Sequence, residues 1–250
     1  MKKIYTLLLT SCLAFSAVSE ATIVQVKTNM GDFEINLFDK TTPVTVQNFL
    51  GYVNNETYDG TVFHRSVPGF VIQGGGFTFQ NALPLLPVKN NAAIANEPKL
   101  SNVRGTVAMA KVGGNPNSAT NQWFVNLADN SGNLDLQNGG FSVFGYIDAQ
   151  GMEVVDAIAK LSRFNFTGIS DLPLRNYTQD DRDDNKALTA DNLVTIESIT
   201  VVESRNTTAD SLNPKPNTLI QEVDDGSSGG STGFLMLLML GFAGWRRLLR

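Results

Sequence analysis

Short alternating runs of apolar and polar residues fill the chain from Thr22 to about Glu203, and they restrict the possible folds more than any other feature. Such alternation is typical of strands that bury one face. The first run, residues 23–38, divides into two strands at the turn 29–31. Further strands are predicted at the following positions: 62–65, 70–73, 106–110, 122–126, 142–147 and 193–202.

Two stretches have the periodicity of helices instead. One follows Thr42, the expected N-cap, starts at Pro43 and has an apolar stripe that ends at Val53. The other covers residues 152–161. A doubly wound α/β sheet would need a helix after nearly every strand, and this chain lacks them. The sequence therefore predicts a mostly β domain, an antiparallel barrel or sandwich covered by two helices.

The charge and the glycine-rich stretches exclude two classes of function. The net charge is −5, whereas a nucleic-acid binder needs clustered positive charge. Gly74, Gly75 and Gly76 follow a predicted strand, but neither a helix nor a Lys-Ser/Thr pair comes after them, so they do not form a phosphate-binding loop. Like the loop 113–122, they are interpreted as turns. No cofactor is expected.

The long polar connection 163–192 contains an acidic stretch. Asp181, Asp183 and Asn185 have the odd spacing of calcium ligands, but Lys186 stands where such a loop needs glycine, and no glutamate closes it. A solvated acidic turn is the better interpretation. No metal site is expected.

The first residues have the features of a secretory signal peptide. Lys2 and Lys3 precede a short apolar run, and small residues follow it near Ser19 and Ala21. The run is too short for a stable membrane span. We therefore expect a signal peptide, residues 1–21, with cleavage near Ser19 or Ala21.

The composition changes twice after the expected domain, residues 22–203. Residues 204–233 are polar and turn-rich, which predicts a flexible linker. Residues 234–250 combine an apolar segment with three arginines and, with the preceding glycine pair, resemble the GlyGly-CTERM sorting signal. That resemblance implies a rhomboid-type sorting protease as a partner, and a short membrane anchor is the alternative. In both cases we expect the domain to be exported, to the periplasm or cell envelope.

Four stretches resemble the cyclophilin family of peptidyl-prolyl cis-trans isomerases, most closely its exported bacterial members. They are, in order, FHRSVPGFVIQGGGF (63–77), RGTVAMAK (104–111), NQWFVNLADN (121–130) and LDLQNGGFSVFGYI (134–147). The likeness extends over residues 23–202. It implies a closed eight-stranded antiparallel β-barrel capped by two α-helices. It also implies an enzyme that accelerates rotation about X–Pro bonds in proline-containing polypeptides. We expect the protein to be a monomer.

This reaction suits a chain whose only histidine is His64. Rotation about an X–Pro bond transfers no proton, and its barrier of about 18–20 kcal/mol comes from amide resonance. In the twisted transition state the imide nitrogen regains a lone pair, which a permanently charged donor can stabilise. The resemblance assigns that role to Arg65.

The resemblance also implies a substrate-binding set around Arg65. Gln73 would position the arginine and bind the backbone of the substrate. Trp123 follows Gln122 in a predicted strand, so its side chain should point to the opposite face, and we expect it in the core. The predicted substrate-binding residues are His64, Phe70, Gln73, Met109, Ala110, Gln122, Phe124, Leu134 and Phe141. The alternative is a proline-peptide-binding chaperone or surface module without turnover, which would not need Arg65.

Several positions depart from the family pattern. Asn133 stands where many members carry tryptophan, with one residue inserted just before it, which puts binding of cyclosporin-type ligands in doubt. Phe141 replaces a histidine, and Lys111 and Val71 replace an asparagine and a methionine. None of these changes removes Arg65 or the aromatic residues, so activity is still expected.

Overall fold

The computed structural model describes residues 21–205 and 212–220. The predicted signal peptide, apart from Ala21, and the predicted sorting segment lie outside the described residues, as do 206–211 and 221–233 of the predicted linker. No helix in the described ranges is both long and apolar enough to cross a bilayer.

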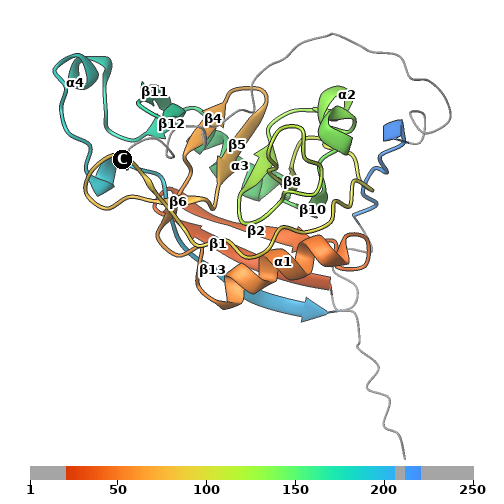
Figure 1. Ribbon diagram of the computed structural model, residues 1–250. Helices are drawn as coiled ribbons and strands as arrows, with labels where there is room; N and C mark the ends of the chain where they lie inside the picture. Colours follow the sequence, from red (N-terminus) through yellow and green to blue (C-terminus); the bar gives the residue numbers. More distant parts are fainter. Residues whose placement is uncertain (1–20, 206–211, 221–250) are drawn as a thin grey trace, which may run out of the picture.

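Antiparallel strands form one sheet that curls into a barrel (Figure 1). Its order is β13–β1–β2–β10–β8–β9–β5–β4, and β3, which precedes β4 directly, pairs with β13 and closes the barrel. If β3 and β4 are counted as one bent strand, the barrel has eight strands, and the predicted fold class is confirmed. The bounds are β1 Ala21–Thr28, β2 Gly31–Leu37, β3 Thr61–Val62, β4 Arg65–Val67, β5 Val71–Gly74, β8 Thr106–Met109, β9 Trp123–Asn126, β10 Val143–Tyr146 and β13 Thr195–Arg205.

The two predicted helices are present. Helix α1, Pro43–Asn54, begins after Thr42 as expected, although the Thr42 side chain makes no capping hydrogen bond. Helix α3, Ala149–Ala159, begins earlier than predicted, because the side chain of Asp148 accepts a hydrogen bond of 2.7 Å from the amide of Gly151 and caps it. Short helices also occur: α2 Ser131–Leu134, η1 Gln137–Gly139, α4 Gln179–Asp183 and η2 Ala190–Asn192.

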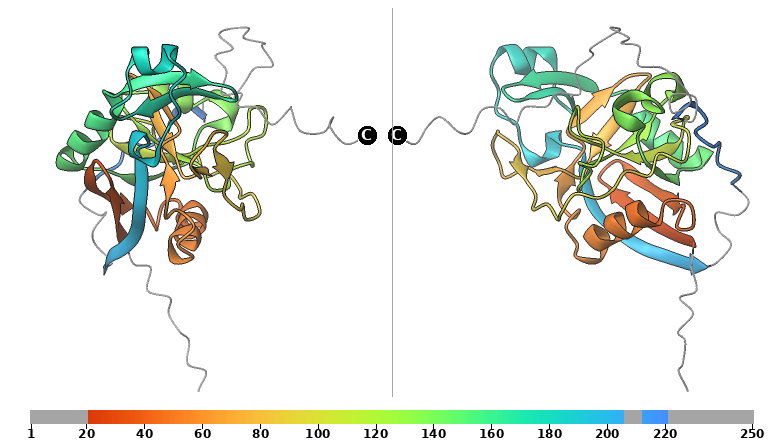
Figure 2. Two further views of the ribbon diagram at one scale, coloured as in Figure 1. Left: turned by 90° about the vertical axis from the view of Figure 1, so that its left-hand side faces the viewer. Right: turned by 45° about the vertical axis from the view of Figure 1, so that its right-hand side comes forward.

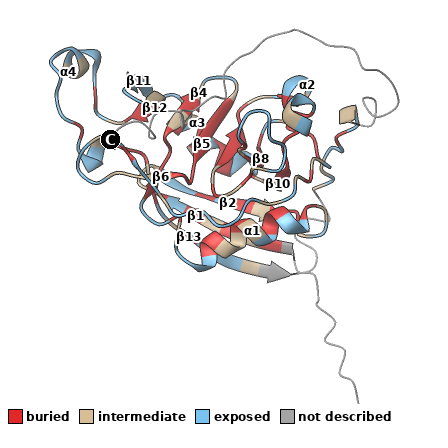
Figure 3. Ribbon diagram, in the orientation of Figure 1, coloured by how far each residue is buried: buried red, intermediate tan, exposed pale blue. Residues whose placement is uncertain are grey.

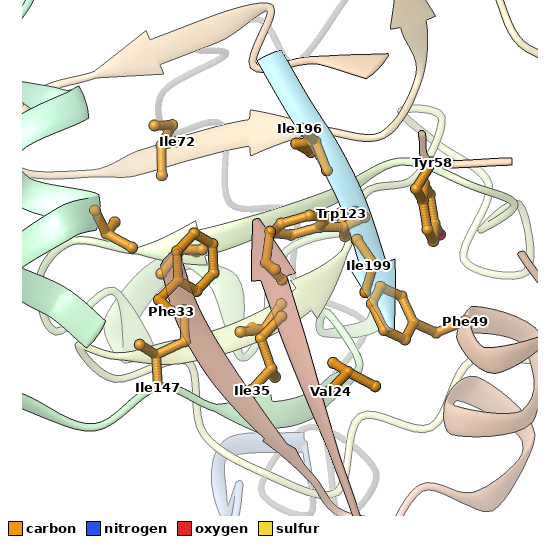
Figure 4. Packing of buried hydrophobic residues seen from close by; sticks show 14 of the residues in the cluster. Val24, Phe33, Ile35, Phe49, Tyr58, Ile72, Trp123, Ile147, Ile196 and Ile199 are labelled. Atoms are coloured by element: carbon orange, nitrogen blue, oxygen red, sulfur yellow. The ribbon is translucent and has the colours of Figure 1, made fainter. Parts of the chain in front are cut away.

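Trp123 lies in the barrel core, as predicted (Figure 4). Its indole is fully buried and makes edge contacts with Phe49 of α1, Tyr58 and Phe63. Gly75 has a φ of +80°, and a Cβ there would lie 2.7 Å from the indole Nε1, so this position of the glycine run must stay without a side chain. The buried strands and the inner face of α1 appear in red in Figure 3.

The prediction of a polar connection over 163–192 is wrong for much of that stretch. It contains the hairpin of β11, Ser162–Phe166, and β12, Ile169–Leu174, which lies on the side of the barrel away from α1 (Figure 2). Strands β6, Phe77–Thr78, and β7, Leu86–Pro87, extend the sheet beside β3. The hairpin has its own apolar cluster, which comprises Val62, Leu85, Phe164, Leu172, Leu174, Tyr177, Leu188 and Leu193.

The acidic stretch in this region forms the exposed helix α4. Asp181 completes a capping box with Thr178 and forms an ion pair of 2.8 Å with Lys186. The described residues contain no group of three or more His, Cys, Asp or Glu side chains arranged to hold a metal ion. A cavity of about 280 Å³ lies beside α4, and none of its lining residues belongs to the predicted site.

The predicted linker, 204–233, includes residues 212–220, which we call the C-terminal strap. The strap is packed against the domain: Pro216 forms an antiparallel bridge with Leu100, and Asn217 is buried. The prediction of a flexible linker is therefore wrong for these residues.

Candidate active site

Adjacent strands carry several predicted site residues in one row across the barrel wall. Arg65 of β4 lies opposite Gln73 of β5, and Gln73 lies opposite Phe124 of β9. Ala108 of β8 continues the row beyond Phe124. Directly opposed residues of an antiparallel pair point to the same face. Since Phe124 and Ala108 belong to a cluster separate from the barrel core, the row lies on the outer face of the barrel.

Arg65 keeps a donor without a protein partner. Its guanidinium is half-buried, and Nη1 has no hydrogen-bond partner. Burial lowers the pKa of Arg65, and the carboxylate of Asp171 on β12, beside β4, acts in the opposite direction. None of the ion pairs among the described residues involves Arg65. Because the ordinary pKa of arginine lies far above neutral pH, the side chain stays charged in spite of this lowering.

Gln73 supplies an acceptor beside this donor. Its Nε2 donates a hydrogen bond of 2.7 Å to Oε1 of Gln122, which leaves its own Oε1 buried without a partner. Gly76 makes room for this arrangement, because a Cβ there would lie 2.6 Å from Cγ of Gln122. Buried polar atoms without partners are rare and need an explanation. Here a donor on Arg65 and an acceptor on Gln73 occupy opposed positions, which suits the binding of a peptide group.

An apolar site cluster adjoins the row. The rings of Phe124 and Phe141 meet edge to face with their centroids 5.7 Å apart, and Leu134 is buried beside them. Phe70 and Ala110 are half-buried, so the cluster reaches solvent there. The buried members are Phe38, Val71, Leu100, Ala108, Phe124, Leu134, Phe141 and Val143, and the partly buried ones are Phe70, Ala110, Tyr146 and Leu212. The structure thus brings together five of the predicted substrate-binding residues, namely Phe70, Ala110, Phe124, Leu134 and Phe141.

Met109 does not belong to this cluster, and its prediction as a substrate contact is wrong. It lies opposite Trp123 and is fully buried in the barrel core. Side chains alternate along a strand, so Ala108, not Met109, shares the face of Phe124. Sequence reasoning did not identify Ala108 and Val71 as members of the apolar site cluster. Ala108 lies opposite Phe124, and Val71 is two residues from Gln73 on the same strand, so the alternation of side chains could have identified both.

His64 is likewise not a wall of the apolar site cluster. It is buried, and its ring meets the edge of Phe77 with centroids 4.8 Å apart. Neither ring nitrogen reaches a partner at hydrogen-bonding geometry, although Val62 and Gln122 lie near enough to favour protonation. Burial dominates and lowers the pKa of His64 to about 4. The histidine is therefore buried near Gln122 and uncharged at neutral pH.

This burial predicts a pH-dependent stability. The unfolded chain takes up a proton on His64 near pH 6.5 and the folded chain only near pH 4, so stabilisation is complete above pH 6.5 and is lost as the pH falls toward 4. We expect His64 to account for a loss of about 2 kcal/mol in the free energy of unfolding between pH 7 and pH 5. Urea unfolding of the wild type and of His64→Gln at both values measures it, and equal pH slopes in the two proteins would contradict the prediction.

Lys111 and Phe141, two departures from the expected pattern, are in contact. The Lys111 ammonium lies 4.7 Å from the centroid of the Phe141 ring. It also donates hydrogen bonds of 2.6 Å and 2.8 Å to the carbonyls of Gly140 and Asn138. Burial lowers the pKa of Lys111 to about 8. Sequence reasoning did not predict that Lys111 anchors the segment that carries Phe141.

Comparisons with known proteins support the same family. The sequence model of the cyclophilin type peptidyl-prolyl cis-trans isomerase/CLD family matches residues 23–178. A peptidyl-prolyl cis-trans isomerase of Acinetobacter baylyi is 45% identical over 143 residues, which are 56% of this chain and 73% of the relative. Peptidyl-prolyl cis-trans isomerase A of Dickeya dadantii is 40% identical over 172 residues, or 65% of this chain and 86% of the relative.

A solved structure shows the same fold. The crystal structure of a cyclophilin type isomerase from Cryptosporidium parvum superposes with a TM-score of 0.53 at 22% identity. The match covers 73% of this chain and 98% of that structure.

Proposed function

Because the chain belongs to the cyclophilin-type peptidyl-prolyl cis-trans isomerase family, an enzyme class, we propose that it rotates X–Pro bonds of exported polypeptides through Arg65. The observation that carries this mechanism is the shared row of Arg65, Gln73 and Phe124. It places a charged donor next to an apolar surface that reaches solvent at Phe70.

The arrangement favours a twisted imide over a planar one. A proline ring seated against Phe70 and Phe124 buries apolar area whichever isomer it has, so this contact binds both ground states. The donor of Arg65 adds an interaction that only the twisted state offers, because its imide nitrogen has a lone pair. Gln73 holds the substrate backbone with its unpaired Oε1. Lowering the barrier by about 7 kcal/mol would accelerate rotation by roughly 10⁵-fold.

The second candidate function is peptide binding without turnover. It needs the apolar site cluster but not a half-buried guanidinium whose donor lacks a partner. Leaving such a group unpaired costs free energy, which argues for a use in catalysis.

The mechanism predicts a rate that does not depend on pH near neutrality. No proton moves, Arg65 stays charged, and His64 is protonated only near pH 4. We expect kcat/KM for an X–Pro peptide to vary by less than about twofold between pH 5.5 and 7.5. Exchange between the cis and trans peptide measured by NMR tests this without a coupling protease. A sigmoidal or bell-shaped profile in that range would show that a titrating acid or base takes part, and no acceleration at any pH would reject the isomerase mechanism.

We also propose that the domain works outside the cytoplasm. The support is the composition of residues 1–21 and 234–250, which resembles a signal peptide and a sorting segment. The mature protein is expected to begin near Ser19 or Ala21, as determined by N-terminal sequencing of the protein from cell fractions. A mature protein that retains Lys2 and Lys3 would contradict export by this route.

A further inference from the structure

The C-terminal strap lies outside the residues that the family model matches, yet it pairs with the domain. The amide of Ser101 donates a hydrogen bond of 2.8 Å to the carbonyl of Lys215, and the amide of Asn217 donates one of 2.9 Å to the carbonyl of Lys99. Figures 1 and 2 show the strap beside α2. This places it next to residues 134–141, which carry Leu134 and Phe141 and which we call the wall segment.

Asn217 connects the strap to the start of the wall segment. Its Nδ2 donates a hydrogen bond of 2.9 Å to the carbonyl of Asp135, and its Oδ1 accepts one of 3.0 Å from the amide of Leu219. The carboxylate of Asp135 is itself buried and accepts hydrogen bonds from Ser101 Oγ, at 2.6 Å, and from the Asn102 amide, at 2.7 Å. The residue directly after Leu134 is thus fixed through both its main chain and its side chain.

The strap also packs against the other end of the wall segment, at Gly140. Gly140 has a φ of +71°, and a Cβ there would lie 2.6 Å from Cδ1 of Ile220. Lys111 binds the carbonyl of this same glycine. Between the two ends, the amide of Phe141 donates a hydrogen bond of 2.9 Å to the carbonyl of Leu134. Leu212, at the start of the strap, packs against the apolar site cluster.

From these contacts we propose that the C-terminal strap positions the wall segment and thereby sets the affinity of the apolar site cluster for proline, with Asn217 as the main positioning residue. The inference rests on the proposed function for the identity of the ligand. If the wall segment is already ordered before binding, the binding free energy is not reduced by the entropy lost in ordering Leu134 and Phe141. The strap touches neither Arg65 nor Gln73 in any hydrogen bond or cluster of the described residues, so it acts on affinity and not on the rotation step.

The test uses the full chain and a proline tetrapeptide whose binding is measured by titration. Asn217→Ala is expected to weaken peptide binding and to raise KM by about three- to tenfold, while kcat changes by less than about twofold. Asn217→Asp keeps the acceptor for Leu219 but loses the donor to Asp135, and we expect a loss at least as large. Thr218→Ala alters an exposed neighbour in the same strap and is the matched control, with wild-type affinity.

Amide hydrogen exchange supplies a second readout. In Asn217→Ala the amides of Leu134 and Phe141 should exchange faster, while those of Val107 and Val125 in the barrel core stay protected. Ile220→Ala, which removes the contact at Gly140 without touching a hydrogen bond, should weaken binding in the same direction. Unchanged peptide affinity in both Asn217→Ala and Ile220→Ala, or an equal loss in Thr218→Ala, would overturn the inference. Since affinity is measured without turnover, this result is separate from a failure of the isomerase mechanism.

Discussion

Replacing Arg65 with alanine is expected to lower kcat/KM for an X–Pro peptide by about 100- to 1,000-fold, or roughly 3–4 kcal/mol of transition-state stabilisation. The reason is that the variant loses the donor that the twisted imide nitrogen needs, while Phe70, Phe124 and Gln73 keep their places. A protease-coupled assay or NMR exchange spectroscopy on the two purified proteins measures the loss.

Arg65→Lys is the matched variant for this prediction. Lysine keeps the charge but replaces the planar fork of the guanidinium with a flexible point charge. We expect intermediate activity, closer to alanine than to arginine. Equal kcat/KM in the wild type and Arg65→Ala would mean that the apolar site cluster alone accelerates rotation.

Replacing Trp123 with alanine is expected to lower the free energy of unfolding by about 3–5 kcal/mol, because a large cavity would open in the barrel core. The indole is fully buried among Phe49, Tyr58 and Phe63. Urea unfolding measures the loss. At low temperature, where the variant stays folded, kcat/KM should remain within a few-fold of the wild type, since Trp123 points away from the row of Arg65.

The next residue along β9 provides the contrast. Phe124 belongs to the apolar site cluster, so Phe124→Ala should lower kcat/KM by roughly 10- to 100-fold, a larger effect on activity than that of Trp123→Ala. Its effect on unfolding should be the smaller of the two. If the two variants affected activity alike, the assignment of opposite faces to Trp123 and Phe124 would be wrong.

The barrel was predictable because each strand has one buried face. Phe33, Ile35 and Leu37 alternate with polar residues, and all three are buried in the core. Side chains alternate between the two faces of β9, and this alternation correctly predicted that Trp123 points into the core. The same alternation places Ala108 and not Met109 beside Phe124. The wrong assignment of Met109 came from the family motif, which identifies a stretch of chain but not the direction of each side chain.

Other features were beyond local patterns. The hairpin of β11 and β12 depends on packing among Phe164, Leu172 and Leu174. Each of its strands has only one short apolar alternation, Phe164 with Phe166 and Leu172 with Leu174, which is too short to indicate a strand by itself. The strap depends on hydrogen bonds between its main chain and residues 99–101, and no periodicity encodes such pairing. His64 could not be assigned because burial, not sequence spacing, sets its neighbours and its pKa.

The most direct test of the mechanism separates binding from rotation in Arg65→Ala. NMR gives both the Kd for an X–Pro peptide and the exchange rate between the cis and trans forms while the peptide is bound. A guanidinium that acts only on the twisted imide predicts that Kd changes by less than about threefold while the bound exchange rate falls by about 100-fold or more. A Kd that rises by the same factor as the rate falls, or a bound exchange rate that stays unchanged, would contradict the account.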